Sequence, residues 1–592
     1  MTTELEDRQQ RGWLNAPLGR RTALRGAALG ASGLAAAALI GCGSDDDDSA
    51  PAASGTTAAA KAPAADPRYA KDPDLPYAYN FPEPAGKTPK PGGTLRVAAT
   101  WDVGPMDPTK SSAGGTIVIP NMVYNRLLGF NRGPESNPQE VKVVPELAKS
   151  WEAAPDGQTY TFKLDPRAKF QNVAPLNGRP FVAEDAKFAF ERYAKEGVHK
   201  SYWVNLSKIE AVDATTLKIS LTKPTPEFEV PLAGRYQTIF PRELVDSGDI
   251  DKKVIGTGPM ILKEAIAADH VTVTKNPDYW EKSVLIDGAE YKMAPDASAR
   301  LASFRAKQVD YAYSPVENKR GLEDLAKTNP DIQVNFLPSS GGSNVFGYNN
   351  QNPKFQDVRV RRALSLAIDR QSIVQLVFEG LGRTGMPSMP WIYVYDKPPT
   401  DVGPWVKLDL AEAKKLLQAA GQENFTFNYA YYPYSTAYDK ISEVLVDQFR
   451  GAGITMKGGK VDYTEFNSQW VGAKLQEATT SGWAALGFDA NTYFYNQIHS
   501  KSGGNRWQIK DPALDALAEQ QSVELDPKKR RELHKKIWDL DLDQMYRPPL
   551  PYGYAYEVLQ PTLRGIRFGG ILGSNSSYYD WGAQIEGAWL DK

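Results

Sequence analysis

Apolar residues recur with strand and helix periods along the chain from about residue 92 onward. Thr94–Ala99 has the apolar pattern of a buried strand, and Tyr160–Leu164 alternates apolar and polar positions directly after a Pro-Asp-Gly turn. Helical spacing is found in the segments 181–193, 358–378, 411–420, 437–450 and 527–540. Because strands and helices interleave throughout, the pattern predicts an α/β fold.

The N-terminal segment has a different pattern. Arg20 and Arg21 precede an Ala/Gly/Leu run that ends at Cys42, which is typical of a twin-arginine export signal. The run falls short of the ~20 strongly apolar residues that a membrane span needs. Residues 39–42, Leu-Ile-Gly-Cys, resemble a bacterial lipobox, in which the cysteine is lipidated and becomes the mature N-terminus. The alternative is an ordinary cleaved signal with a chance cysteine.

We therefore expect residues 1–42 to be a twin-arginine-type lipoprotein signal peptide. Residues 43–91, rich in Ala, Pro, Thr, Ser and Lys and opening with an aspartate run, are expected to be a disordered tether. The expected location is extracytoplasmic, anchored to the cell membrane through lipidated Cys42, in a periplasm or on the outer face of a plasma membrane. Two acyl chains suffice for such anchoring, at about 0.8 kcal/mol per buried methylene.

Length, charge and cysteine content indicate the number of lobes and exclude several classes of function. A chain of 592 residues is too long for one core, so two or three lobes are expected. A net charge of −2 gives no basic field for nucleic acid. With Cys42 as the one cysteine, the folded part offers no thiol nucleophile, disulfide or cysteine-based zinc site. The histidines are far apart and match no ligand spacing, so no metal or cofactor is predicted.

Three motifs that could suggest catalysis or phosphate or nucleic-acid binding are better explained as structural features. The adjacent acids Glu184 and Asp185 fit the first turn of a helix better than acid/base chemistry. Residues 256–259, Gly-Thr-Gly-Pro, lack the lysine of a phosphate loop and predict a tight turn. The basic run 359–362 is flanked by aspartates and predicts a paired helix surface. No Gly-x-Ser-x-Gly elbow is present.

Aromatic residues gather between Trp470 and Trp507, in a region that contains glycine and asparagine and few helix signals. Large rings in such a region form either core or the walls of a ligand cleft. Taken singly, each ring fits the core better. Together with Trp483, the amides of Asn491 and Asn505 make a cleft equally plausible, because amides orient a ligand through hydrogen bonds.

Several segments, in order, resemble the extracytoplasmic solute-binding proteins of peptide/nickel-type ABC transporters. No one motif is decisive, but their number, order and spacing cover the region from residue 92 to the C-terminus. The matching segments are 92–95, 106–108, 123–128, 145–151, 160–170, 177–185, 256–259, 276–280, 355–364, 367–370, 413–417, 420–421 and 453–454.

The resemblance implies a two-lobe clamshell of the type II periplasmic-binding-protein class, with an extra subdomain. Lobe I would combine residues 92–127, 236–338 and 559–592, the extra subdomain II would take 128–235, and lobe III would take 339–558. Segments 341–348 and 550–556 would form the hinge. A ligand held between the lobes would stabilise a closed state that docks on a permease.

The resemblance also implies ligand-binding positions. These are Ser112, Gly114, Tyr313, Ser314, Tyr463, Trp470, Trp483 and Ala484, with Asp489 and Asn491 added from the aromatic region. The chain departs from the peptide-binding pattern at Leu486, where an aspartate holds the ligand's amine, and at Thr480, where an arginine receives its carboxylate. Asp489 could take the amine-holding role if the loop is longer. Otherwise the ligand is a neutral or differently charged solute, for example an oligosaccharide stacked on Trp483 and Trp470.

Three hypotheses follow. The first is a monomeric, lipid-anchored receptor that delivers peptides or a related small solute to an ABC importer, with no catalytic activity. The second is an extracellular glycoside hydrolase with two carboxylates among Asp102, Asp107, Glu465 and Asp489, about 5–10 Å apart. The third is a sensory or chaperone-like binding protein of the same fold. Nickel is disfavoured except within an organic chelate.

Overall fold

The computed structural model describes residues 87–110, 114–131, 142–316, 318–337, 345–384, 391–395, 399, 401–433, 436–470, 474–481, 489–553, 555–566 and 585–592. The predicted signal peptide, with Arg20, Arg21 and Cys42, lies outside the described residues. So does the predicted tether, apart from its last residues.

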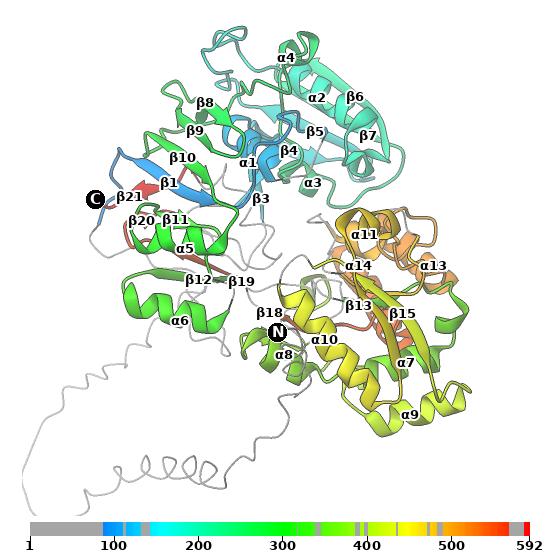
Figure 1. Ribbon diagram of the computed structural model, residues 1–592. Helices are drawn as coiled ribbons and strands as arrows, with labels where there is room; N and C mark the ends of the chain where they lie inside the picture. Colours follow the sequence, from blue (N-terminus) through cyan, green and yellow to red (C-terminus); the bar gives the residue numbers. More distant parts are fainter. Residues whose placement is uncertain are drawn as a thin grey trace, which may run out of the picture. The chain divides into compact units, whose positions relative to one another are not determined.

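A mixed seven-stranded sheet contains the first predicted strand at its centre (Figure 1). Its order is β12 (Gln333–Leu337), β19 (Ala555–Leu559), β11 (Tyr311–Ala312), β1 (Thr94–Ala99), β10 (Gly288–Met293), β9 (His270–Lys275) and β8 (Met260–Ile266). Strand β1 runs parallel to both neighbours, β10 and β11. Its side chains Leu95, Val97 and Ala99 are fully buried, which confirms the predicted buried strand.

A four-stranded antiparallel sheet follows in the sequence. Its order is β4 (Ala148–Ala153), β5 (Thr159–Leu164), β7 (Thr216–Leu221) and β6 (Leu206–Asp213), and helix α2 (Ala183–Glu196) packs on it. The predicted strand and helix in this region are both confirmed. Asp185 lies in the first turn of α2, where it accepts a hydrogen bond from the Val182 amide and pairs with Arg179. It is therefore a helix-start residue, as its position predicted.

A second four-stranded sheet has the order β13 (Val345–Tyr348), β17 (Ala478–Ser481), β15 (Thr426–Tyr431) and β16 (Thr455–Lys460). Helices α9 (Leu410–Ala419), α10 (Thr436–Gly451) and α14 (Pro527–Gln544) confirm three predicted segments. The observed ends of these helices lie close to the predicted ones. Asp409 and Asp526, for example, cap α9 and α14 by accepting backbone N–H bonds.

The prediction of one helix over 358–378 is wrong. The chain forms α7 (Val358–Leu366) and α8 (Arg370–Phe378) instead. Asp369 caps α8 by accepting from the Ser372 amide, so the backbone leaves the helix at residues 367–369. The sequence pattern did not reveal this break, because Asp369 falls at a position where a continuous amphipathic helix would also have a polar residue.

The remaining elements are short or connect the sheets. The helices are α1 (Gly114–Val123), α3 (Glu229–Ala233), α4 (Arg242–Asp246), α5 (Ala297–Arg305), α6 (Lys319–Thr328), α11 (Tyr463–Trp470), α12 (Ala490–Phe494) and α13 (Pro512–Val523). The strands are β2 (Leu128–Phe130), β3 (Val143–Pro145), β14 (Gly382–Arg383), β18 (Tyr552–Gly553), β20 (Leu563–Arg564) and β21 (Trp589–Leu590). Short 3₁₀ turns lie at Lys200–Trp203, Pro353–Phe355, Trp391–Tyr393 and Pro404–Val406.

The basic run predicted as a paired helix surface is only partly one. Arg359 pairs with Asp357 and Arg362 with Asp543 at the surface, as expected. Arg361, however, is buried and donates to the backbone carbonyls of Phe355 and Gln544. A charged residue enters the interior here because carbonyl oxygens satisfy its donors.

The glycines at 256 and 258 lie close against the last residues of helix α1, and no hydrogen bond among the described residues closes the predicted tight turn within 256–259. A Cβ on Gly256 or Gly258 would lie 2.4 or 2.6 Å from the carbonyl oxygen of Val123, which only glycine avoids. The amide of Gly258 donates to that same carbonyl at 2.8 Å. The two glycines therefore allow this segment to pack closely against the backbone of α1.

Candidate ligand site

Two predicted site segments leave the same edge of the seven-stranded sheet. Strands β1 and β11 are adjacent and parallel, with Val97 opposite Tyr311 and Ala98 opposite Ala312. The segment after β1 leads to Ser112 and Gly114, and the segment after β11 carries Tyr313 and Ser314. In α/β sheets, ligands bind beyond the carboxyl ends of the strands, because loops that follow parallel strands meet there.

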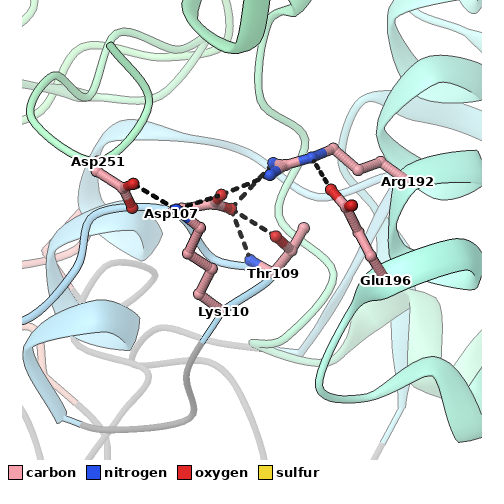
Figure 2. Close-up of polar contacts among 6 residues, drawn as sticks. All are labelled: Asp107, Thr109, Lys110, Arg192, Glu196 and Asp251. Atoms are coloured by element: carbon pink, nitrogen blue, oxygen red, sulfur yellow. Dashed lines mark hydrogen bonds and ion pairs between the residues drawn. The ribbon is translucent and has the colours of Figure 1, made fainter. Parts of the chain in front are cut away.

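The segment after β1 is held by a buried ion pair (Figure 2). Asp107 is fully buried and accepts two hydrogen bonds from the Arg192 guanidinium, at 3.0 and 2.6 Å. It also accepts from the amide and hydroxyl of Thr109, at 3.0 and 2.7 Å. Burial alone would raise the pKa of Asp107, but the bonds from Arg192 and Thr109 outweigh it and hold that pKa below its usual value.

Further charges surround this pair. The Nε of Arg192 donates to Glu196 at 2.5 Å, and Lys110 pairs with Asp251 while its Nζ lies 3.9 Å from Asp107 (Figure 2). Helix α2 therefore fixes the course of the chain between β1 and α1. Of the predicted site residues that follow, Ser112 lies outside the described residues, and Gly114 is the first residue of α1.

The segment after β11 is held from two sides. Tyr313 is fully buried and packs edge-to-face on Tyr311, with 4.9 Å between ring centroids. Arg300 of α5 donates to the carbonyl oxygens of Tyr313 and Ser314, at 2.7 and 3.3 Å. Ser314 is exposed and has a φ of +36°, a left-handed conformation that is uncommon for serine. The structure thus fixes this turn at an energetic cost.

The strand next to β11 carries a buried carboxylate. Glu557 of β19 is 3% exposed and accepts a hydrogen bond from the Tyr311 hydroxyl. Burial raises the pKa of Glu557 to about 7, although the hydrogen bond from Tyr311 lowers it. Nothing in the sequence pattern singles out Glu557 or Arg192, because their partners are 246 and 85 residues away.

Asp489 and Asn491 belong to the start of helix α12. Asp489 is the N-cap and accepts from the Thr492 amide and hydroxyl, at 3.0 and 2.6 Å. Burial raises the pKa of its carboxyl, against the lowering effect of those bonds. The amide oxygen of Asn491 accepts from Gln521 at 2.9 Å, and Gln521 in turn bonds His534. Both predicted residues therefore have structural partners already.

Trp470 is a core residue. It is 2% exposed and packs on Trp507 with ring centroids 4.5 Å apart. Tyr463 opens the same helix, α11. Trp483 and Ala484 lie outside the described residues, as does Leu486, while Thr480 is buried in β17 and accepts from the Tyr429 hydroxyl. The ligand-contact roles of all these residues stay predictions.

The carboxylates of the hydrolase hypothesis each have another role. Asp102 accepts from the amides of Val103 and Ala268, Asp107 pairs with Arg192, and Asp489 caps α12. Glu465 lies in the first turn of α11 and is exposed. Acids committed to turns, caps and ion pairs are not an acid/base pair facing a shared water, so this arrangement does not support glycoside hydrolysis.

Two properties of the described residues bear on metal sites and on membrane spans. Among them, no group of three His, Cys, Asp or Glu side chains could hold a metal ion. In the same part of the chain, no helix is both long and apolar enough to cross a bilayer. His499 and His534 are buried and hydrogen-bonded, and burial lowers the pKa of His534 to about 3.

Comparison with known proteins identifies the class. Residues 142–505 match the family of bacterial extracellular solute-binding proteins, family 5 (middle region). The chain belongs to this family. A relative, di/tripeptide-binding protein 1 of Pseudomonas aeruginosa, is 27% identical over 494 residues, which cover 77% of this chain and 88% of that protein. The heme-binding protein A of Haemophilus influenzae is 25% identical over 476 residues, covering 75% and 84%.

A solved structure confirms the expected fold. The periplasmic binding protein DppA of Helicobacter pylori, in complex with the peptide STSA, has a TM-score of 0.69 at 24% identity, covering 85% of this chain and 99% of that chain. The protein is therefore an α/β, two-lobe binding protein of the periplasmic type. The relatives are binding proteins and not enzymes, in agreement with the predicted non-enzymatic role.

Proposed function

We propose that this chain is the lipid-anchored receptor of an ABC importer, and that it captures peptides or a related small solute between its two lobes for delivery to a permease. The observation that carries the proposal is the family match over residues 142–505. The di/tripeptide-binding relative supports peptides as the ligand class. The adjacent parallel strands β1 and β11, whose following segments share one sheet edge, support a site in that place.

The site would combine elements of both lobes. Tyr313 and Ser314, with Ser112 and Gly114, would contact the ligand from lobe I. Trp483, Ala484, Trp470, Tyr463, Asp489 and Asn491 would contact it from lobe III. The proposed domain limits are those predicted above. Binding at micromolar affinity corresponds to about −8 kcal/mol, which one buried cleft can supply.

Native mass spectrometry of the purified protein tests the ligand class directly. A retained mass that matches a short peptide supports the proposal, and a retained carbohydrate or tetrapyrrole contradicts the peptide assignment. A thermal-shift comparison of trialanine with maltotriose extends the test, since a ligand at a hundred times its Kd adds about 2.7 kcal/mol of stability. Trp483→Ala should weaken binding, whereas the control Trp405→Ala, beside Arg362, should not.

The second candidate is a neutral solute such as an oligosaccharide, captured by the same fold. One observation favours it: both carboxylate oxygens of Asp489 are already bonded to Thr492. A peptide amine would have to share that carboxylate, because Leu486 stands where peptide binders place their acid. Preference for maltotriose over trialanine in the thermal-shift comparison would select this candidate.

The membrane anchor is tested separately. Cys42→Ser removes the thiol that lipidation needs, so the variant should leave the membrane fraction and appear in the soluble fraction after export. Arg20→Lys/Arg21→Lys should instead retain the precursor inside the cell if the export signal reads the arginine pair. Membrane retention of the Cys42→Ser protein would contradict the anchor without affecting the ligand assignment.

A further inference from the structure

We propose that residues 379–381, which fall within the predicted lobe III, form a pivot: Glu379 and Leu381 attach the end of helix α8 to lobe I and so limit how the two lobes move apart. The inference rests on the proposed function, because a pivot has a role only if the lobes close on a ligand. It goes further by naming residues that set the balance between open and closed states.

The segment after α8 holds the short strand β18. This strand ends at Gly553, two residues before β19 begins in the seven-stranded sheet. Strand β14 pairs antiparallel with β18, with Gly382 opposite Gly553 and Arg383 opposite Tyr552. The Phe378 ring lies against Gly553, where an added Cβ would be 2.5 Å from the ring atom Cδ1. The end of α8 and β14 therefore hold the chain just before it enters the sheet of lobe I.

Leu381 is buried in a hydrophobic cluster that otherwise belongs to the seven-stranded sheet and its helices. The Leu381 residue is 9% exposed. The other buried members of the cluster come from β1, α5, β11, α6, β12, β19 and the segments beside them, and they are Ala98, Phe304, Val309, Ala312, Val316, Leu322, Leu325, Val334 and Val558. Moving this leucine away would expose apolar surface on both sides, so the contact resists separation.

Glu379 adds a polar contact at the same place. Its Oε2 accepts a hydrogen bond of 2.9 Å from the Arg320 amide, in the first turn of α6, where Asn318 also accepts from Gly321. The first-turn amides of a helix have no partner within the helix, and they favour a carboxylate. Glu379 has a left-handed φ of +52° at a helix end, where glycine is the usual residue. Glycine would relieve the backbone there but would lose the carboxylate that bonds α6.

These contacts join α8 and β14 to both sides of the crossing. Through β18 they hold the chain that enters the seven-stranded sheet, and through Glu379 and Leu381 they contact α6 and the core beside it. A joint held on both sides can turn but resists separation, so it keeps the unliganded lobes within a narrow range of positions. A ligand that needs both lobes then binds more tightly, because a larger fraction of the molecules is competent to bind.

Distances between the lobes test the pivot without any ligand. Spin labels are attached to Gln308→Cys, after α5, and to Gln418→Cys, on α9, in the full chain with Cys42→Ser; both glutamines are exposed. With the native residues at 379–381, double electron–electron resonance should give a narrow distribution of distances. Leu381→Ala should broaden the distribution, and Leu381→Met, which keeps most of the buried surface, should restore it.

The matched control is Leu376→Ala. Leu376 lies on the same helix, α8, but it is 64% exposed, so this variant should give the native distribution of distances. Glu379→Gln removes the charge at the start of α6 without opening a cavity, and it should broaden the distribution less than Leu381→Ala does. If Leu381→Ala fails to fold, Glu379→Gln provides the comparison with Leu376→Ala.

Binding of trialanine tests the functional half. Leu381→Ala should bind about three- to tenfold more weakly than the wild type, in proportion to the smaller competent fraction, and Leu376→Ala should bind as the wild type does. An unchanged distribution of distances in Leu381→Ala and Glu379→Gln would overturn the pivot. A broadened distribution with unchanged affinity would overturn its link to ligand binding. If trialanine does not bind the wild type, the peptide assignment fails while the distances still decide the role of residues 379–381.

Discussion

Two buried carboxylates, Asp107 after β1 and Glu557 in β19, belong to the two strands that flank β11, and their pKa values shift in opposite directions. Asp107 has a bidentate arginine and a pKa below its usual value. Glu557 has a tyrosine hydroxyl as its partner, and its pKa rises to about 7. Both lose solvation, so the guanidinium decides the direction. A buried carboxyl group that is paired with a cation stays ionised at neutral pH. A buried carboxyl group with only neutral hydrogen-bond donors can change its protonation state there.

The largest expected effect comes from removing the cation. Arg192→Met should leave Asp107 buried without its partner and lower the free energy of unfolding by about 3–5 kcal/mol. Urea denaturation at pH 7 measures this loss. Lys195→Met, an exposed lysine on the same helix, is the control and should unfold as the wild type does. Equal stability of the two variants would mean that the ion pair contributes nothing net.

A smaller effect is expected from neutralising the acid. Asp107→Asn keeps the shape but loses charge-assisted bonds, which should lower the free energy of unfolding by about 2 kcal/mol at pH 7. Because the folded-state pKa is depressed, this stabilisation is present above the unfolded value of about 3.9 and is lost as pH falls through the folded one. The difference between wild type and variant should therefore shrink in acid. A difference that stays constant down to pH 3 would contradict the assignment.

The smallest effect, and the one of opposite sign, is expected at Glu557. Its folded-state pKa is raised, so its contribution to stability is present below the unfolded pKa and is lost as pH rises through about 7. Glu557→Gln should therefore raise the free energy of unfolding at pH 8 by about 1 kcal/mol relative to wild type and change little at pH 5. Urea denaturation at both pH values checks this sign, and a loss of stability at pH 8 would contradict it.

Local patterns predicted much of the fold. The buried strand at Thr94–Ala99 and the helix capped near Asp185 depend on neighbouring residues, which the sequence displays. The break at Asp369 was missed because a capping aspartate resembles a polar position of a continuous helix. The burial of Arg361 was missed because one of its carbonyl acceptors, Gln544, is 183 residues away, and the pattern of apolar positions does not show that nearby carbonyls accept its other hydrogen bonds.

The candidate site was less predictable for the same reason. The sequence made Asp107 a candidate catalytic acid, because nothing near it in the chain indicates its partner Arg192. In the fold, Nη2 of Arg192 lies 2.6 Å from Oδ2 of Asp107. Glu557 has no local pattern at all, since its hydrogen-bond partner, Tyr311, is 246 residues away in the sequence. The resemblance to known binding proteins supplied the proposed region of the site, while the charge partners of Asp107 in the segment after β1 came from the structure.

The strand order also determines when each sheet can fold during synthesis of the chain. β19 lies between β11 and β12, and the Tyr311 hydroxyl bonds a residue 246 positions later in the chain. A ribosome must therefore release residue 559 before the large sheet can close, whereas the sheet of β4, β5, β6 and β7 has all its strands by residue 221. Until then β11 and β12 present unpaired edges, which are prone to aggregation. Nascent chains stalled before residue 555 should accordingly be the form that chaperones and proteases recognise.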